Sequence, residues 1–266
     1  MTKDAKKMRG KSWGLYIWCF LVMFFLVIPV IIIIPMSFSG ASIMEFPPTS
    51  FSFRWYQELA TDEGWLNAIG NSLKIGVGTM VLSCVLGILA SIGITNKHMK
   101  FGGFINIICL LPMMFPAVIA AVALYLVYGS WKIVGSFPAI IIAHTCLAIP
   151  MVITLMTSAL SNVDASLYDA ARSLGASHFT ANIKVVLPLV KPAIFTSMLF
   201  SFITSFDESV VSLFITNRNS ITLPKMIFNA LKYEISPVIS AISTILIVIT
   251  IIIFFLNALI NNKKEA

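Results

Sequence analysis

Six long apolar runs dominate this 266-residue chain, and they constrain its fold more than any other feature. Hydrophobic residues make up 58% of the sequence and charged residues only 11%, whereas a soluble globular domain carries about 25% charged residues. Each run is long enough for the roughly 20 residues that a membrane-spanning helix needs. The runs cover Trp13–Met36, Ile69–Thr95, Gly103–Tyr128, Phe137–Leu160, Leu189–Phe214 and Val238–Ile260.

These runs predict the fold class directly. Because unpaired backbone polar groups are costly in lipid, each run is expected to be helical. We therefore expect an all-α polytopic membrane protein with about six transmembrane helices, in which residues 1–266 form a single transmembrane domain. The four cysteines lie inside apolar runs without a CxxC spacing, and the three histidines are scattered. Neither pattern predicts a disulfide framework or a metal site.

Lysine and arginine residues predict the orientation of the chain in the membrane. If the N-terminus is inside, the cytoplasmic segments hold twelve of them and the opposite segments six. This bias predicts a multi-pass protein with both termini in the cytoplasm. Since the cations lie mostly beside apolar runs, the net charge of +7 is interpreted as a topology signal. Binding of nucleic acid is not expected.

A polar segment with a central glycine, Tyr168–Pro188, lies between the fourth and fifth apolar runs. Such a segment is out of place between membrane spans unless another molecule binds it. Asp164 or Ser161 can N-cap a helix from about Ala165 to Leu174. Gly175 suits the left-handed backbone conformation that commonly ends such a helix.

A second short helix is predicted after this glycine. Ser177 can cap it, and we expect it to run to about Val186, where Pro188 stops it. Two short helices at an angle form a compact body, here called the knob (residues 161–188), which can transmit rigid-body motion. By this orientation the knob is cytoplasmic. The chain has no G-x-x-x-x-G-K-[ST] motif, so a nucleotide site on this chain is not expected.

Two adjacent acids, Asp207 and Glu208, interrupt the fifth apolar run. A charged residue near the centre of a membrane costs about 2.5–3.5 kcal/mol on insertion scales, so such residues usually serve a function. We expect the pair to line a path for a cationic substrate. Two alternatives remain: the acids cap a break in this helix, or they pair with a Lys or Arg of a partner subunit.

Serines and aromatic residues near the acids are further candidates for this path. Serines recur every three to four residues on one face of the predicted helix. Aromatic rings can add cation–π contacts to a bound cation, although ordinary packing or an aromatic belt explains each of them equally well. The candidates are Ser201, Ser205, Phe206, Tyr125 and Trp131.

The spacing in the knob resembles a known motif. Asp169-Ala170-Ala171, three residues, Gly175, nine residues and Val185-x-Leu187-Pro188 match the E-A-A-x3-G-x9-I-x-L-P loop of ABC importer permeases, with Asp for Glu and Val for Ile. Over nearly the whole chain, the segments SFRWY, NSLKIG, RSLGAS, LPLVKPAI and SFDESVVSLF resemble the PotC-type subunits of spermidine/putrescine importers.

This resemblance implies a MetI-like, type I importer permease fold in the bacterial cytoplasmic membrane. It implies that the chain is not an enzyme and binds no cofactor, because ATP and Mg²⁺ are used by a separate ABC ATPase dimer. It implies three further partners, namely a second permease subunit of the PotB-like kind, an extracytoplasmic substrate-binding protein and membrane lipid. The residues that it assigns to ATPase coupling are Asp169, Ala170, Ala171, Gly175, Leu187 and Pro188.

The resemblance also suggests the cargo. A PotC-like subunit is expected to import polyamines, spermidine or putrescine. The same subfamily includes importers of phosphonates, iron and opines, which remain alternatives. A secondary transporter is an alternative of another class, and it would leave the knob unexplained.

Overall fold

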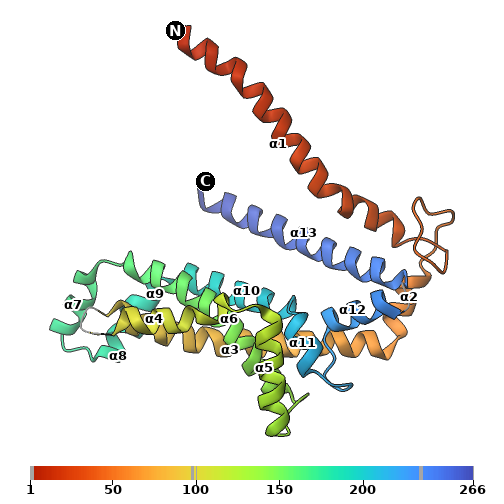
Figure 1. The fold of residues 1–266 in the computed structure, drawn as a ribbon. Coiled ribbons are helices and arrows are strands. Elements are labelled where there is room, and N and C mark those ends of the chain that lie inside the picture. The colour runs from red at the N-terminus through yellow and green to blue at the C-terminus, as the bar shows by residue number, and fades with distance from the viewer. Residues whose placement is uncertain (1–2, 97–98, 100, 234–235, 266) are drawn as a thin grey trace. The chain divides into compact units, whose positions relative to one another are not determined.

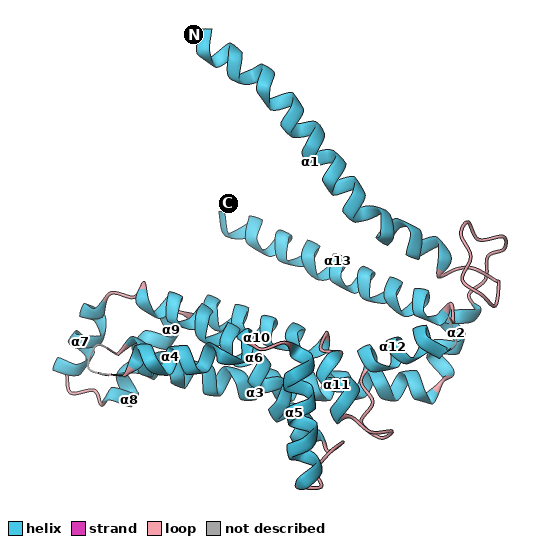
Figure 2. Cartoon of the chain, in the orientation of Figure 1, coloured by secondary structure: helices cyan, strands magenta, loops and turns pink. Residues whose placement is uncertain are grey.

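The computed structural model describes residues 3–96, 99, 101–233 and 236–265 of the chain, and the side chains of 13–96, 99, 101–232 and 236–252. Helices joined by loops make up this part of the chain, and the only strand-like pairing in it is an isolated bridge between Ser39 and Phe51 (Figure 2). The prediction of an all-α fold is confirmed. The helices divide between two compact units, Met1–Leu66 with Asn229–Ala266 and Asn67–Phe228. Each unit is described by itself below.

The first unit contains α1 (Lys3–Met36), α2 (Arg54–Thr61) and α13 (Val238–Glu265), and α13 packs against both α1 and α2. The loop between α1 and α2 is tied to α2 by two hydrogen bonds. The indole Nε1 of Trp55 donates to the carbonyl oxygen of Ser39 at 2.7 Å, and the hydroxyls of Ser37 and Tyr56 lie 2.7 Å apart. Trp55 is buried, so it serves as an internal anchor for this loop.

The second unit contains the knob and the acid pair. Helix α3 begins just before this unit, and α12 ends just after it. The helices of the unit are α3 (Glu63–Thr95), α4 (Gly102–Leu110), the 3₁₀ turn η1 (Leu111–Met114), α5 (Ala117–Ser130), α6 (Phe137–Ser161), α7 (Ala165–Ser173), α8 (His178–Ala181), the π-helical turn η2 (Asn182–Val186), α9 (Leu187–Leu189), α10 (Lys191–Phe206), α11 (Val210–Ile215) and α12 (Leu223–Tyr233).

Helix α6 forms the centre of this unit, and Ile140, Ile153 and Met156 on it are fully buried. Its first half packs with α3, α5 and α11, and its second half packs with α3 and with the chain leading into α10. Gly87 lets α3 approach α6 closely, because a Cβ built there would lie only 2.9 Å from the Cβ of Val152. Figure 1 shows α3, α4, α6 and α10 running alongside one another, with α7 and α8 at one end.

Three helices among the described residues are long and apolar enough to span a membrane, namely α1 from Trp13, α3 and α6. Two further candidates are helix pairs with a sharp bend. Gly102–Met114 and Ala117–Ser130 meet at 98°, and His178–Leu189 and Lys191–Phe206 meet at 81°. All six predicted runs therefore fall on helices, but the runs Gly103–Tyr128 and Leu189–Phe214 are each interrupted.

Proline explains the first of these interruptions. Pro116 disfavours helical backbone at the preceding residue, and Phe115 is accordingly extended, with φ −89° and ψ 139°. The chain then starts α5 in a new direction. At the other bend, Pro188 does not stop the second knob helix as predicted. The π-helical turn at Asn182–Val186 absorbs the missing N–H of the proline, and the helix continues to Leu189.

The basic residues at 3–11, 97, 100 and 263–264, which carry much of the predicted orientation, lie outside the part of the chain whose side chains are described. The predicted cytoplasmic location of both termini therefore stays a prediction. The same holds for the prediction that residues 1–266 form one domain.

Candidate functional site

The first helix of the knob is α7, and its capping residues act as the sequence predicts. The carboxylate of Asp164 accepts a hydrogen bond from the backbone N–H of Ser166 at 2.9 Å, which makes Asp164 the N-cap. Hydrogen bonds from Ser166 hold the pKa of Asp164 below its ordinary value. At the other end, Gly175 has φ +85° and donates its N–H to the carbonyl oxygen of Arg172 at 3.0 Å. This left-handed glycine ends the helix.

The second helix of the knob begins at α8 and is tied to α7. Ser177 caps it by accepting from the N–H of Thr180 at 3.1 Å. The hydroxyl of Tyr168 hydrogen-bonds to Nδ1 of His178, and the two rings stack with their centroids 6.3 Å apart. The guanidinium of Arg172 also donates to the carbonyl oxygen of Ala176 across the turn. The knob is thus held together by side-chain contacts between its two helices.

The root of the knob is buried in the apolar core of the unit. Val186 and Val190 pack in one cluster with Met156 and Leu160 of α6 and Cys84 of α3. A cavity of about 400 Å³ lies beside this contact, between the end of α6, the start of α7 and the start of α10. The knob is therefore packed against α3 and α6 through apolar side chains at its root.

The outer surface of the knob carries apolar side chains that contact little else. Leu174 is 90% exposed and Phe179 72% exposed. Of the residues predicted to couple, Asp169, Ala170, Gly175 and Pro188 are exposed, whereas Ala171 and Leu187 are half-buried. These residues lie on α7, on α9 and in the turn after α7, and Figure 1 shows α7 and α8 at one end of the unit.

The acid pair lies at the other end of α10. That helix ends at Phe206, and α11 begins at Val210, so Asp207 and Glu208 sit in a break of three residues. Oε1 of Glu208 accepts a hydrogen bond from the N–H of Val211 at 2.9 Å. Asp207 is exposed. Within the described part of the chain, neither its carboxylate nor that of Glu208 forms an ion pair. Glu208 therefore fits the alternative in which an acid caps a break in this helix.

The serines predicted to line a path are buried. Ser201 is fully buried and Ser205 is 5% exposed, and both face neighbouring helices. The hydroxyls of Ser201 and Ser83 hydrogen-bond at 2.5 Å, and Ser205 donates to the hydroxyl of Thr79 at 3.2 Å. In this conformation the serine face of α10 joins helices together and borders no open path.

Two of the predicted aromatic candidates lie on or next to α5, and the third, Phe206, directly precedes the acids in the chain. Tyr125 and Trp131 on or next to α5 are 46% and 66% exposed, and Trp131 has a ring contact with buried Tyr128. Phe206 is half-buried and stacks on Phe202, with centroids 5.6 Å apart. Among the described residues, no ring contact or hydrogen bond joins these aromatics to Asp207 or Glu208.

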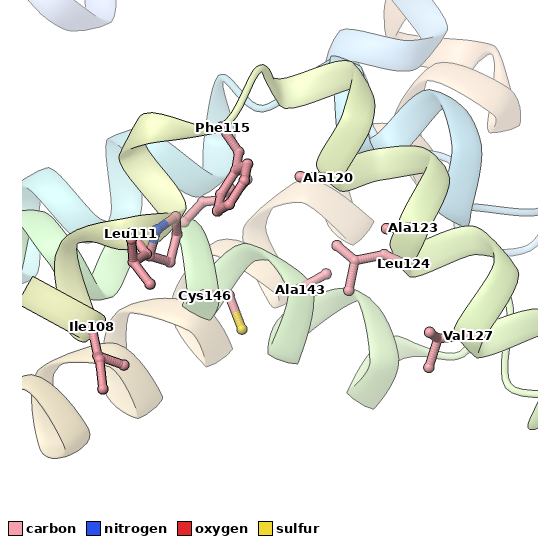
Figure 3. A pocket seen from close by; sticks show the side chains of 11 residues that line it. Ile108, Leu111, Phe115, Ala120, Ala123, Leu124, Val127, Ala143 and Cys146 are labelled. Atoms are coloured by element: carbon pink, nitrogen blue, oxygen red, sulfur yellow. The ribbon is translucent and has the colours of Figure 1, made fainter.

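A cavity beside α5 is lined by neither of the acids. The bend before α5 leaves a cavity of about 380 Å³ over α6, and its lining is almost entirely apolar. Figure 3 shows Phe115 and Leu124 on opposite sides of this space and Cys146 of α6 at its floor. A cation entering it would lose hydration without gaining a polar partner, so this cavity does not suit a charged cargo.

Three groups in this region were not predicted as site residues from the sequence. His144 of α6 is fully buried and hydrogen-bonds to Ser205 and Ser212, as expected for a packed polar residue of a span. Thr79 meets Ser205, and the ammonium of Lys225 donates to the carbonyl oxygens of Leu213 and Thr216. For His144 and Thr79, the only signal in the sequence was a polar residue inside an apolar run. No group of three His, Cys, Asp or Glu able to hold a metal ion occurs in the described part of the chain.

Comparison with known proteins identifies the family. Residues 83–265 match the family described as "Binding-protein-dependent transport system inner membrane component". The chain is 30% identical over 240 residues to the spermidine/putrescine transport system permease protein PotC of Escherichia coli (strain K12), with 90% of each chain covered. It is 27% identical over 231 residues to the putrescine transport system permease protein PotI of the same strain, covering 84% of this chain and 82% of PotI.

A solved structure shares the fold. A chain of a bacterial ABC transporter involved in the import of the acidic polysaccharide alginate superposes with a TM-score of 0.76 at 20% identity, covering 97% of this chain and 98% of that chain. The fold is therefore that of a MetI-like ABC permease, as expected. With a match over most of its length, the chain belongs to the family of inner-membrane permease components of binding-protein-dependent transport systems, and it is a multi-pass membrane protein.

Proposed function

We propose that this chain is the permease subunit of an ATP-driven importer that carries polyamines, spermidine or putrescine, across the bacterial cytoplasmic membrane. The observation that carries the proposal is the position of two features at opposite ends of one helix. The knob immediately precedes α10, and the acid pair immediately follows it. A helix of 16 residues is about 24 Å long, close to the thickness of a membrane core.

The knob is the part of the chain suited to receive force from an ATPase. A separate ABC ATPase dimer would bind Leu174, Phe179 and the Asp169-Ala170-Ala171 turn, and would hydrolyse ATP with Mg²⁺ on its own chains. The contacts between Tyr168 and His178 keep the knob from deforming under load. Both termini would lie in the cytoplasm, on the same side as the knob.

Asp207 is the residue suited to meet a cationic cargo. Its carboxylate is exposed at the end of α10, whereas that of Glu208 is already bound to the backbone of α11. Polyamines carry several positive charges, and a carboxylate in a region of low dielectric attracts such charges more strongly than one in water. The 30% identity to PotC supports this cargo over others.

Two further partners complete the proposal. A second permease subunit, similar to this one, would form the other wall of the path. An extracytoplasmic binding protein would deliver the cargo, by analogy with the alginate transporter whose structure includes a periplasmic protein bound to an alginate pentasaccharide. Motion of the knob would then switch the path between its two openings, which is rigid-body alternating access.

Import of a cargo other than a polyamine is the competing proposal. The chain is also 26% identical over 170 residues to the sulfoquinovosyl glycerol permease SmoH of Agrobacterium fabrum, covering 64% of this chain and 60% of SmoH. Phosphonates, iron and opines are the other candidates raised by the resemblance. None of these explains an exposed acid in a span as simply as a polycation does.

Transport by the complete importer tests the proposal. The chain would be reconstituted in liposomes with its partner permease, ATPase and binding protein, and uptake of radiolabelled spermidine and putrescine measured. We expect uptake that requires both ATP and the binding protein, and competition by unlabelled polyamine but not by phosphonate or an opine. Uptake without ATP would indicate a secondary transporter. ATP-driven uptake of another cargo alone would keep the importer but reject polyamines.

A further inference from the structure

One imidazole bridges the two helices on either side of the acid pair. Nδ1 of His144 lies 2.9 Å from the hydroxyl of Ser205, two residues before Asp207. Nε2 of the same ring lies 3.3 Å from the hydroxyl of Ser212, four residues after Glu208. His144 has no exposed surface. The break between α10 and α11 is therefore spanned, on its buried side, by a single side chain from α6.

The direction of the hydrogen bonds follows from their partners. Ser205 donates its proton to the hydroxyl of Thr79 on α3, at 3.2 Å. It is then the acceptor toward His144, so Nδ1 carries the proton and Nε2 accepts from Ser212. Ser205 and the His144 ring each donate one hydrogen bond and accept one. Four helices, α3, α6, α10 and α11, thus meet in one polar network.

The remaining contacts of α11 hold the short helix at both ends. It has only six residues, too few to be stable by itself. Glu208 caps its first turn, and the ammonium of Lys225 binds the carbonyl oxygens of Leu213 and Thr216 at 3.1 and 2.9 Å. A negative group at the start and a positive group at the end also favour the helix dipole. Among the described residues, His144 is the one side chain that hydrogen-bonds to both α10 and α11, through Ser205 and Ser212.

We propose that His144 is a positioning residue for substrate recognition: by bridging Ser205 and Ser212 it fixes the geometry of the break that presents the carboxylate of Asp207. His144 contacts neither acid itself. The part of this inference that concerns the cargo rests on the proposed function. The part that concerns the geometry of the break stands independently of the cargo.

Two sets of variants, each with its own control, separate positioning from general stability. Ser205→Ala and Ser212→Ala each remove one bond of the bridge. Ser197→Ala is the matched control, because Ser197 is fully buried on the same face of α10 and its hydroxyl has no partner among the described residues. His144→Asn breaks the bridge at its centre. Its control is Thr145→Val, a buried neighbour on α6 whose hydroxyl is likewise without a partner in the described part of the chain.

The geometry is measured without any cargo, in the complete importer in proteoliposomes. A single cysteine replaces Ser209 in the break after the four native cysteines are changed to Ala, and its rate of labelling by a membrane-impermeant maleimide is followed. Loss of one hydrogen bond of ordinary strength should raise the labelling rate about two- to tenfold in Ser205→Ala, Ser212→Ala and His144→Asn. The two control variants should label at the parental rate.

The second readout is the KM for spermidine against the maximal rate of uptake. We expect the three bridge variants, with Ser209 intact, to raise KM about two- to tenfold and to leave the maximal rate and basal ATPase activity near those of the controls. A lower melting temperature with unchanged labelling and unchanged KM would overturn the proposal, because it would reduce the network to a structural one. If the importer carries no polyamine, the proposed function fails, and the labelling rate alone still decides whether His144 fixes the break.

Discussion

The carboxylate of Glu208 accepts a hydrogen bond from the backbone N–H of Val211 at 2.9 Å, across the first turn of α11. Its neighbour Asp207 is exposed and makes no such contact within the described part of the chain. Two acids that are adjacent in sequence and equal in charge thus stand in different environments. One satisfies the backbone at the start of a helix, and the other is free to meet a ligand.

This difference predicts opposite responses to loss of charge. Asp207→Asn removes the charge that we propose attracts the cargo, and we expect it to raise the KM for spermidine about tenfold or more, since charged hydrogen bonds contribute about 1.5–3 kcal/mol. Glu208→Gln keeps a side-chain oxygen of the same reach, which can accept the hydrogen bond from the N–H of Val211. It should retain most uptake, whereas Glu208→Ala, which cannot cap, should lose it.

Basal ATPase activity of the importer is the control for these variants. It should change less than uptake in Asp207→Asn, because the knob is untouched. Equal loss of uptake in Asp207→Asn and Glu208→Gln would show that both charges act together. Full uptake by Asp207→Asn would show that the charge of Asp207 is not part of the substrate path.

The second prediction concerns Gly175, a position that requires a particular backbone conformation and no particular side-chain contact. Its φ is +85°, and a Cβ built there would meet nothing within 4 Å. Proline cannot adopt this φ and lacks the N–H that Gly175 donates to Arg172. Gly175→Pro should therefore abolish transport while the chain still inserts in the membrane, as measured by uptake and by the amount of chain in membrane fractions.

A graded series distinguishes conformation from size at this position. Asn tolerates the left-handed region, whereas Val there costs about 1–2 kcal/mol or more. Gly175→Asn should keep substantial uptake, and Gly175→Val should lose most of it. Normal uptake by the Pro variant would reject the coupling role of the knob.

The apolar surface of the knob gives a third prediction. Leu174 and Phe179 are 90% and 72% exposed, so truncating them removes few contacts within the chain. Phe179→Ala and Leu174→Ser should leave the melting temperature of the permease unchanged but weaken its binding to the ATPase at least tenfold, in keeping with a buried aromatic anchor at an interface. Co-purification and titration with the ATPase measure this.

Ser173→Ala is the control for the knob surface. Ser173 is exposed on the same helix, but its hydroxyl bonds only to the carbonyl oxygen of Asp169 within that helix. It should bind the ATPase normally. If all three variants bind normally, the ATPase docks elsewhere.

Close packing of α3 on α6 gives a fourth prediction. A methyl group at Gly87 would lie 2.9 Å from the Cβ of Val152, so Gly87→Ala must push the two helices apart. We expect a loss of about 1–3 kcal/mol, seen as a lower melting temperature in detergent. Gly70→Ala on the same helix meets nothing within 4 Å and should be neutral or slightly stabilising. Equal effects at both positions would contradict this packing.

Local features of the knob were readable from the sequence because their causes are local. Asp164 and Ser177 cap the helices that follow them, and Gly175 takes the left-handed conformation, all through contacts within four residues. The prediction that Pro188 ends the second knob helix was wrong, also for a local reason. A π-helical turn accommodated the proline, and spacing alone does not distinguish such a turn from a helix end.

The positions of the apolar spans and the resemblance of the knob to the permease loop were determined by the sequence alone. Hydrophobicity and short-range hydrogen bonding act along the chain, so a linear pattern records them. The surroundings of the serine face and of the two acids were decided only by the tertiary structure. His144 meets Ser205 and Ser212 across 61 and 68 residues of chain, and no spacing in the sequence specifies which polar groups will share a buried interface. Because an unpaired polar group is costly in the interior of a membrane protein, packing of α3, α6, α10 and α11 selected these partners, and with them the one acid left exposed.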